Sequence, residues 1–308
     1  MNDQLKKPKV SICVVTYNQE KYIRQCLQSI VDQKTNFDFE VIVGDDCSTD
    51  NTPDIVLDFW NKYPNIIIPI LNKKNLGPTR NYIQTHLRAR GEYIAHMDGD
   101  DFSYPGKLRI QANYLDLNNN LVLIWHGVDV VNNLGHKRHV LSPYLNTLLD
   151  ATNITQRDVL KYGSLGAACS LMYRKSAGKF LSDISVEVLD YYIALKLLES
   201  GNAARLLPIL GAYRYDDSAI TSSKNTFRYF IGSSMRTLYA KHLNYFYIKN
   251  KDNKDVICLN AFFYFLVELR FLRTSSLMFL ILSIRTFTFS TIFEMPKYLI
   301  DSLKLRSK

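Results

Sequence analysis

The 308-residue sequence predicts an α/β fold in which helices flank a mostly parallel β-sheet, followed by a helical C-terminal appendage. Three observations lead to this expectation. Short apolar runs alternate with segments of helical periodicity in the first half of the chain. Hydrophobic residues make up 47% and charged residues 22%, an ordinary globular balance that excludes a disordered chain. The last part of the chain differs from the rest, because it is basic and rich in aromatic residues.

Five apolar runs rich in β-branched residues are typical of strands buried in a parallel sheet. They are Val10–Thr16, Phe39–Gly44, Asn65–Leu71, Glu92–Met97 and Leu121–Val131. Pro69 cannot donate a hydrogen bond to a neighbouring strand, so the third run is expected at the edge of the sheet.

Helices are predicted between these runs, and right-handed crossovers through them keep the strands parallel. Their limits follow from helical spacing of apolar residues and from Gly and Pro at their ends. The predicted helices are Tyr22–Val31, a helix beginning at Thr52-Pro53, Gly77–Arg90 and Pro105–Leu117.

The middle of the chain is less regular than the first part. A strand is expected over Ser164–Arg174 and a helix over Asp190–Glu199, and Leu206–Tyr213 is another apolar run. From Phe227 onward the pattern predicts helices, with basic residues placed among aromatic ones.

Polar clusters follow three of the predicted strands. They are Thr16-Tyr17-Asn18, Asp45-Asp46 and Asp98-Gly99-Asp100. In open α/β sheets, ligands bind beyond the carboxyl ends of the strands. The position of the clusters therefore indicates a binding site at that edge.

Asp98 and Asp100 stand one residue apart in a turn that Gly99 allows to be tight. Two carboxylates so placed offer hard oxygen ligands to Mg²⁺ or Mn²⁺, which bridge diphosphate oxygens. A solvated acidic turn is the alternative for an isolated pair of this kind, but the position after a buried strand favours a metal site.

Asp46 is a candidate to bind a base or ribose, although Asp45-Asp46-Cys47-Ser48 also fits a turn closed by Asx hydrogen bonds. Thr16, Tyr17 and Asn18 combine an aromatic ring with small polar groups that suit a nucleotide. A helix cap is the alternative role for these residues.

These residues also carry a resemblance. VSICVVTYNQEKYIRQCLQSIVDQ, FEVIVGDDCSTDNT, NLGPTRNYIQ and GEYIAHMDGDDFSYPGKL occur in the order and spacing of family-2 inverting glycosyltransferases of the GT-A fold. The resemblance covers about residues 9–120 and becomes scattered as far as Thr221. Val15 departs from the family pattern, where Pro is frequent, and Cys47-Ser48 replaces the usual Gly-Ser.

The resemblance implies roles for several residues in binding a nucleotide-sugar. Asp46 would contact the nucleotide, and Asp98 and Asp100 would coordinate the divalent metal, Mn²⁺ or Mg²⁺, on the donor diphosphate. Arg80 would line the donor pocket at a helix start. Arg214, in a Tyr-Arg segment, would neutralise the leaving phosphate charge, although a surface position would leave it without a role.

Inverting transfer needs a general base to remove the acceptor hydroxyl proton. The family places this base in a Glu-Asp pair at a helix start, and the matching stretch here is Val186–Tyr192. Leu189 interrupts the pair, so Asp190 is the expected base and Glu187 the reserve. A helix N-cap is the alternative role for Asp190. His96, just before the acidic turn, is expected to be a core histidine with its hydrogen bonds satisfied.

The segment from Lys224 to Lys308 has 14 basic and 5 acidic residues, so it carries the whole net charge of +9. Helices with interleaved basic and aromatic residues suit a membrane surface, and Ala261–Arg273 is the clearest case. A helical packing module or a dimer interface would have a similar pattern. Nucleic-acid binding is disfavoured, because this segment is too apolar for a solvated groove.

The sequence also predicts a compartment. The apolar stretch near the N-terminus, SICVV, is too short for the core of a signal peptide. In the most apolar window, Thr274–Phe293, Arg285 lies near the centre, which disfavours a transmembrane span. The five cysteines are scattered without a CxxC pair, as expected for reduced thiols. We expect a cytoplasmic protein that is peripheral at the inner face of the cell membrane.

Together these features predict a glycosyltransferase, specifically a hexosyltransferase, that acts in cell-surface polysaccharide biosynthesis with a glycan or lipid-linked oligosaccharide as acceptor. Two domains are predicted. The first, 1–223, has a nucleotide-sugar half at about 9–120 and an acceptor half at about 121–223, and the second is 224–308.

An inactive scaffold that kept the fold is one alternative function. A sugar-phosphate nucleotidyltransferase is another, but VVTYNQEKYI lacks the glycines of its phosphate loop. No GxGxxG follows any strand, which excludes a dinucleotide dehydrogenase.

Overall fold

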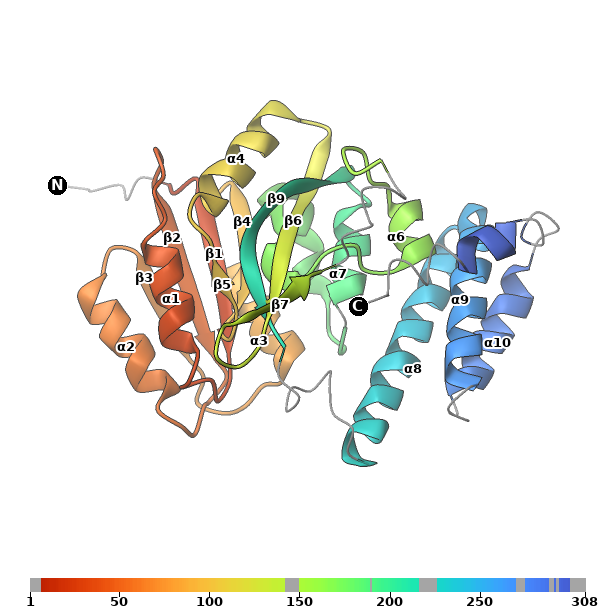
Figure 1. The fold of residues 1–308 in the computed structure, drawn as a ribbon, viewed down its shortest axis with the longest axis horizontal. Coiled ribbons are helices and arrows are strands. Elements are labelled where there is room, and N and C mark those ends of the chain that lie inside the picture. The colour runs from red at the N-terminus through yellow and green to blue at the C-terminus, as the bar shows by residue number, and fades with distance from the viewer. Residues whose placement is uncertain are drawn as a thin grey trace. The chain divides into compact units, whose positions relative to one another are not determined.

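The computed structural model describes residues 7–141, 150–188, 190–215, 226–269, 275–287, 291 and 294–299 (Figure 1). The chain forms two compact units, neither of which is continuous in sequence. The first comprises Met1–Leu141, Gly166–Glu187 and Leu197–Arg214. The second comprises Ser142–Leu165, Val188–Lys196 and Tyr215–Lys308. The division at residues 223 and 224 expected from the sequence stays a prediction.

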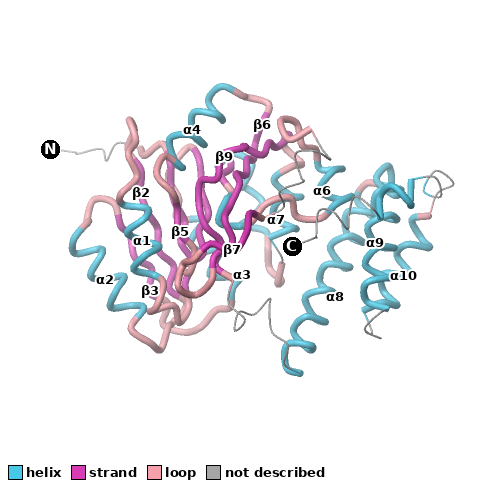
Figure 2. The backbone as a smooth tube through the Cα atoms, in the orientation of Figure 1, coloured by secondary structure: helices cyan, strands magenta, loops and turns pink. Residues whose placement is uncertain are grey.

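A single sheet forms the centre of the first unit (Figure 2), in the order β3-β2-β1-β4-β8-β6-β9-β5, with β7 paired to β6. The first four strands along the chain pair in parallel. They are β1 (Val10–Thr16), β2 (Phe39–Asp45), β3 (Ile67–Leu71) and β4 (Tyr93–Asp98). The strand that contains Pro69 lies at the edge, as its missing N–H donor predicts.

The rest of the sheet is mixed. Its strands are β5 (Phe102–Ser103), β6 (Leu121–Val131), β7 (Lys137–Val140), β8 (Met172–Arg174) and β9 (Asn202–Arg214). β6 pairs in parallel with β9, whereas β8 is antiparallel to both β4 and β6. The strand expected over Ser164–Arg174 is shorter than predicted, because a 3₁₀ turn at Ala168–Ser170 precedes β8. The predicted fold class is confirmed, with antiparallel pairing confined to the later strands.

Helices cover both faces of the sheet. They are α1 (Ile23–Val31), α2 (Thr52–Lys62), α3 (Pro78–Leu87) and α4 (Lys107–Leu117). Apolar side chains of α1, α2 and α4 share one core with alternate residues of β1, β2 and β4. The other face of β1 and β2 contacts α3. Gly44 makes this close approach possible, since a Cβ there would lie 2.0 Å from Oγ1 of Thr85.

The second unit is helical among its described residues. Its helices are α6 (Gln156–Tyr162), α7 (Asp190–Leu197, of which the last residue belongs to the first unit), α8 (Thr226–Lys249), α9 (Lys254–Leu269) and α10 (Ser275–Thr286). α8, α9 and α10 pack against one another (Figure 1). The helices expected from Phe227 onward are therefore present. None of the described helices is both long enough and apolar enough to cross a membrane.

Candidate active site

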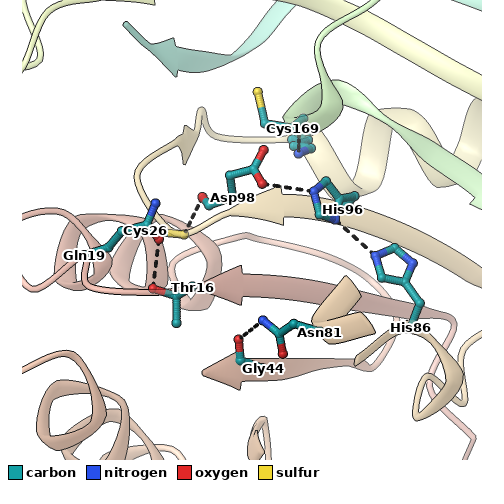
Figure 3. Close-up of polar contacts among 10 residues, drawn as sticks. Thr16, Gln19, Cys26, Gly44, Asn81, His86, His96, Asp98 and Cys169 are labelled. Atoms are coloured by element: carbon teal, nitrogen blue, oxygen red, sulfur yellow. Dashed lines mark hydrogen bonds and ion pairs between the residues drawn. The ribbon is translucent and has the colours of Figure 1, made fainter. Parts of the chain in front are cut away.

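The polar clusters after β1, β2 and β4 meet at one edge of the sheet, because these strands are parallel neighbours. The register pairs Val15 with Asp98 and Thr16 with Asp45, so the three strands end at the same level. Figure 3 shows Thr16 and Asp98 at these adjoining strand ends. This edge is the candidate active site, and the residues around it fall into three loops.

The acidic turn at the end of β4 is held against the loop after β1. Gly99 lies so close to that loop that a Cβ would be 2.5 Å from Oε1 of Gln19 and 2.8 Å from Oγ1 of Thr16. Only glycine fits this approach, which places Asp98 and Asp100 on either side of the contact. The spacing of the two carboxylates is therefore tied to the backbone of the turn.

The carboxyl groups of this turn repel one another in a poorly hydrated place. Burial, and then the charge of Asp98, raise the pKa of Asp100 to about 6. Burial also raises the pKa of Asp101, with further contributions from Asp100 and Asp98. Asp101 faces inward, where it accepts the backbone N–H of Arg214 at 2.7 Å and a hydrogen bond from Cys169. The side chain of Asp98 is 35% exposed, so it can reach a ligand.

This donor set fits a divalent cation that the substrate helps to bind. Among the described residues, no group of three or more His, Cys, Asp or Glu side chains could hold a metal ion alone. Mg²⁺ is ordinarily bound through one or two carboxylates together with substrate phosphates and water. Asp98 and Asp100 supply two carboxylates. Burial, and then the charge of Asp98, disfavour the ionised form of Asp100, and a bound cation would favour it.

The loop after β1 starts with one buried and one exposed residue. The hydroxyl of Thr16 donates to Oε1 of Gln19 at 2.8 Å (Figure 3), so its direct use toward a ligand would require that bond to change. Tyr17 is 48% exposed, and its ring is available for stacking. The nucleotide role of both residues stays a prediction.

Asn18 joins the loops after β1 and β2. Its side-chain oxygen accepts the N–H of Thr49 at 2.8 Å, and its own N–H donates to the hydroxyl of Ser48 at 2.8 Å. Its φ of +52° is in the left-handed region, which Asn tolerates better than most residues. The helix-cap alternative fails for Asn18, since Tyr22 occupies the N-cap position of α1.

Asp46 organises the loop that leads into α3. Its carboxylate accepts the N–H of Leu76 at 2.8 Å and the N–H of Gly77 at 2.9 Å. The strand-exit turn considered as an alternative is formed by Asp45, which accepts both the N–H and the hydroxyl of Ser48. The two adjacent carboxylates thus have different partners, and nucleotide binding by Asp46 stays a prediction.

Glu187, the alternative general base, lies beside the start of α3. Glu187 accepts a hydrogen bond from the hydroxyl of Thr79 at 2.6 Å, next to Arg80, whose side chain is exposed. Glu187 belongs to the first unit, as does the acidic turn. Asp190 is the first residue of α7, is exposed, and belongs to the second unit. The base role of either residue stays a prediction.

Arg214 is buried and holds the acidic turn through its guanidinium group. Nε donates to the carbonyl of Asp100 at 2.8 Å, and Nη1 donates to the carbonyls of Asn132 and Asn133. Nη2 donates to Oε1 of Gln25 at 2.7 Å. These contacts show a positioning role in the protein, and the expected contact with a phosphate stays a prediction.

Sequence reasoning missed three residues of this region. Gln19 contacts Thr16 and stabilises the charged form of Asp100. Lys107 donates to the carbonyl of Cys169 at 2.6 Å beneath the turn, and burial lowers its pKa to about 8. His86 lies behind the site and contacts His96. Of these three residues, only Lys107 could have been noticed in the sequence. It lies on the same face of α4 as Leu108 and Leu115, and a charged residue on a buried helix face is unusual.

Comparison with known proteins agrees with this geometry. The family model for glycosyl transferase family 2 matches residues 11–180. An uncharacterized protein of Mycobacterium tuberculosis is 33% identical over 220 residues, which cover 71% of this chain and 62% of that protein. The chain thus matches less than two thirds of that relative's length. Abequosyltransferase RfbV of Salmonella typhimurium is 38% identical over 109 residues, 35% of this chain and 32% of RfbV.

Solved structures share the fold at lower identity. The Staphylococcus aureus TarS 1–349 complex with UDP-GlcNAc aligns with a TM-score of 0.59 and 21% identity, covering 81% of this chain and 70% of the other. The mannosyltransferase PcManGT of Pyrobaculum calidifontis, bound to GDP-Man and Mn²⁺, aligns with a TM-score of 0.57 and 15% identity. That alignment covers 99% of this chain and 89% of the other. With its motifs, fold and family match in agreement, the chain belongs to glycosyltransferase family 2.

Proposed function

We propose that this protein moves a hexose, with inversion, from a nucleotide-diphosphate sugar to a glycan acceptor in cell-surface polysaccharide biosynthesis. One observation carries the proposal: Asp98 and Asp100 flank a tight turn at the same sheet edge as Asp46 and the loop after β1. That edge can receive a diphosphate at the turn and a nucleoside beside it. Two proteins of similar fold, TarS and PcManGT, have been solved in complex with UDP-GlcNAc and GDP-Man respectively, which supports a donor of this class.

Asp98 and Asp100 would hold the cofactor, Mn²⁺ or Mg²⁺. When bound, the cation would neutralise charge on the departing diphosphate. Asp46 would bind the nucleoside together with Thr16, Tyr17 and Asn18. Arg80, exposed on the first turn of α3, would line the donor pocket, and Arg214 would add a positive charge near the phosphates.

The chemical step forms one bond and breaks another. The acceptor hydroxyl oxygen attacks the anomeric carbon while the bond from that carbon to the phosphate oxygen breaks. The hydroxyl proton passes to the base, proposed to be Asp190, with Glu187 as the reserve. Attack on the face opposite the leaving group inverts the anomeric configuration. Glu187 accepts a hydrogen bond from the hydroxyl of Thr79 in the structure.

A lipid-linked acceptor would bring the enzyme to the inner face of the cell membrane. Two hydrogen bonds, from Tyr247 to the carbonyl of Arg285 and from Arg285 to Asn244, join the ends of α8 and α10. Exposed apolar side chains stand near these ends: Tyr245, Ile248, Ile281, Ile284 and Phe287. With basic residues beside them, they suit an anionic lipid surface.

Release of nucleoside diphosphate from a panel of nucleotide sugars tests the donor and metal together. We expect one donor to be turned over with Mn²⁺ and not with EDTA. Asp100→Ala should lower the rate by at least about 100-fold, because charge stabilisation of this kind contributes several kcal/mol. Asp58→Ala is the matched control, since Asp58 is exposed on α2 and should not affect turnover. A folded protein that binds and turns over no donor would favour the inactive scaffold.

Steady-state kinetics with the donor so identified test the base. Asp190→Asn should lower kcat by about 10²- to 10⁴-fold with little change in donor KM, because general base catalysis contributes that much. Glu187→Gln should have a smaller effect. If Glu187→Gln abolishes turnover and Asp190→Asn does not, the two roles are reversed.

Flotation with lipid vesicles tests membrane association. The protein should bind vesicles that contain phosphatidylglycerol and not vesicles of phosphatidylcholine alone. Ile284→Ser should weaken partitioning by about tenfold, given the roughly 1.5–3 kcal/mol for burying such a side chain. Leu117→Ser is the control, because Leu117 is exposed on α4 in the first unit. A concentration-dependent dimer that Ile284→Ser dissociates, without vesicle binding, would instead identify a dimer interface.

A further inference from the structure

A line of buried polar side chains reaches Asp98 from the interior of the first unit (Figure 3). The hydroxyl of Tyr173 lies 2.9 Å from Nδ1 of His86. Nε2 of His86 lies 3.1 Å from Nδ1 of His96, and Nε2 of His96 lies 3.3 Å from Oδ1 of Asp98. Each ring nitrogen in this line therefore has one partner.

The fold explains why these four residues align. Side chains alternate along β4, so His96 and Asp98 point to the same face of the sheet, where α3 lies. His86 comes from the last turn of α3. Tyr173 comes from β8, whose antiparallel register places it opposite Ile94, two residues before His96.

The direction of the hydrogen bonds follows from one condition. An ionised Asp98 carboxylate only accepts, so Nε2 of His96 must carry a proton. In a neutral His96, Nδ1 is then an acceptor, and Nε2–H of His86 donates to it. Nδ1 of His86 in turn accepts the hydroxyl proton of Tyr173. All three bonds then point toward Asp98, an arrangement in which each bond strengthens the next.

The surroundings hold these rings in place. His86 and His96 are each 2% exposed, and Tyr173 is fully buried. Burial, and then His96, lower the pKa of His86 well below its usual value, and burial raises the pKa of Tyr173. The ring of Tyr82 stacks on His86 with centroids 3.8 Å apart. Water has little access to replace any of these bonds.

We infer that His86 and His96 are positioning residues, which hold the Asp98 carboxylate at Oδ1 and so orient the partly exposed group toward the divalent cation. This inference rests on the proposed function, because the cation is part of it. A histidine that merely fills the core needs no such line. His126, which is 1% exposed, pairs Nδ1 with the carbonyl of Gly127, and its Nε2 has no hydrogen-bond partner among the described residues.

The state of the rings is testable without any ligand. Long-range ¹⁵N–¹H correlation spectra of protein labelled at histidine should show a proton on Nε2 of both His86 and His96, with the signals assigned by single substitution of each. A His96 ring with no proton on Nε2 would overturn the inference, because it could not donate to Asp98. This measurement does not depend on whether the protein turns over a donor.

Affinity for Mn²⁺ in the presence of UDP or GDP, from the electron paramagnetic resonance signal of the free ion and corrected for binding of Mn²⁺ to the nucleotide in solution, tests the effect on the site. His96→Leu should weaken Mn²⁺ binding about 10- to 100-fold, which is typical when a residue that orients a metal ligand is lost. His96→Gln, which keeps an N–H near the position of Nε2, should recover most of that loss. His126→Leu is the matched control and should bind Mn²⁺ as the wild type does.

Equal Mn²⁺ affinity in His96→Leu and the wild type would overturn the inference, as would a wild-type protein that does not bind Mn²⁺. Equal losses in His96→Leu and His126→Leu would also overturn it, because they would show a general effect on folding. If the wild type binds Mn²⁺ but turns over no nucleotide sugar, the proposed function fails while the positioning role stands.

Discussion

The site depends on holding three carboxyl groups within one turn at the end of a buried strand. Burial and mutual repulsion raise the pKa of Asp100 and Asp101, so the turn stores electrostatic strain. The protein opposes this strain from the inner side with two buried cations. The charge of Arg214 favours ionised Asp100, and Lys107 lies in the field of Asp101. The proposed metal would act on the same excess of charge from the substrate side.

The strands and the polar clusters at their ends were predictable from the sequence, because both depend on local pattern. β1 has the predicted bounds, and β2 and β4 each end one residue beyond theirs, since short β-branched runs between helices leave little choice of structure. Parallel pairing then brings the ends of these strands to one edge. The short strand β8 was less predictable, because three residues of antiparallel pairing depend on contacts with β4 and β6 that lie far away in the chain.

The contacts that hold the site were not predictable, because they join residues distant in sequence. Arg214, at the end of β9, donates hydrogen bonds to Asp100 and Gln25. The sequence predicted only a contact with a phosphate and neither of these bonds. Glu187 meets Thr79 across more than a hundred residues. His96 is buried and hydrogen-bonded, as expected of a core histidine, but only the structure shows that its partners are His86 and Asp98.

The central claim is that the diphosphate and its cation bind at the turn between Asp98 and Asp100. A crystal grown with Mn²⁺ and the nucleoside diphosphate released by the enzyme, with data collected at the manganese absorption edge, tests this claim most directly. The account predicts one strong anomalous peak within coordination distance of carboxylate oxygens of Asp98 and Asp100. A peak elsewhere, with the nucleotide bound and the turn unoccupied, would contradict it.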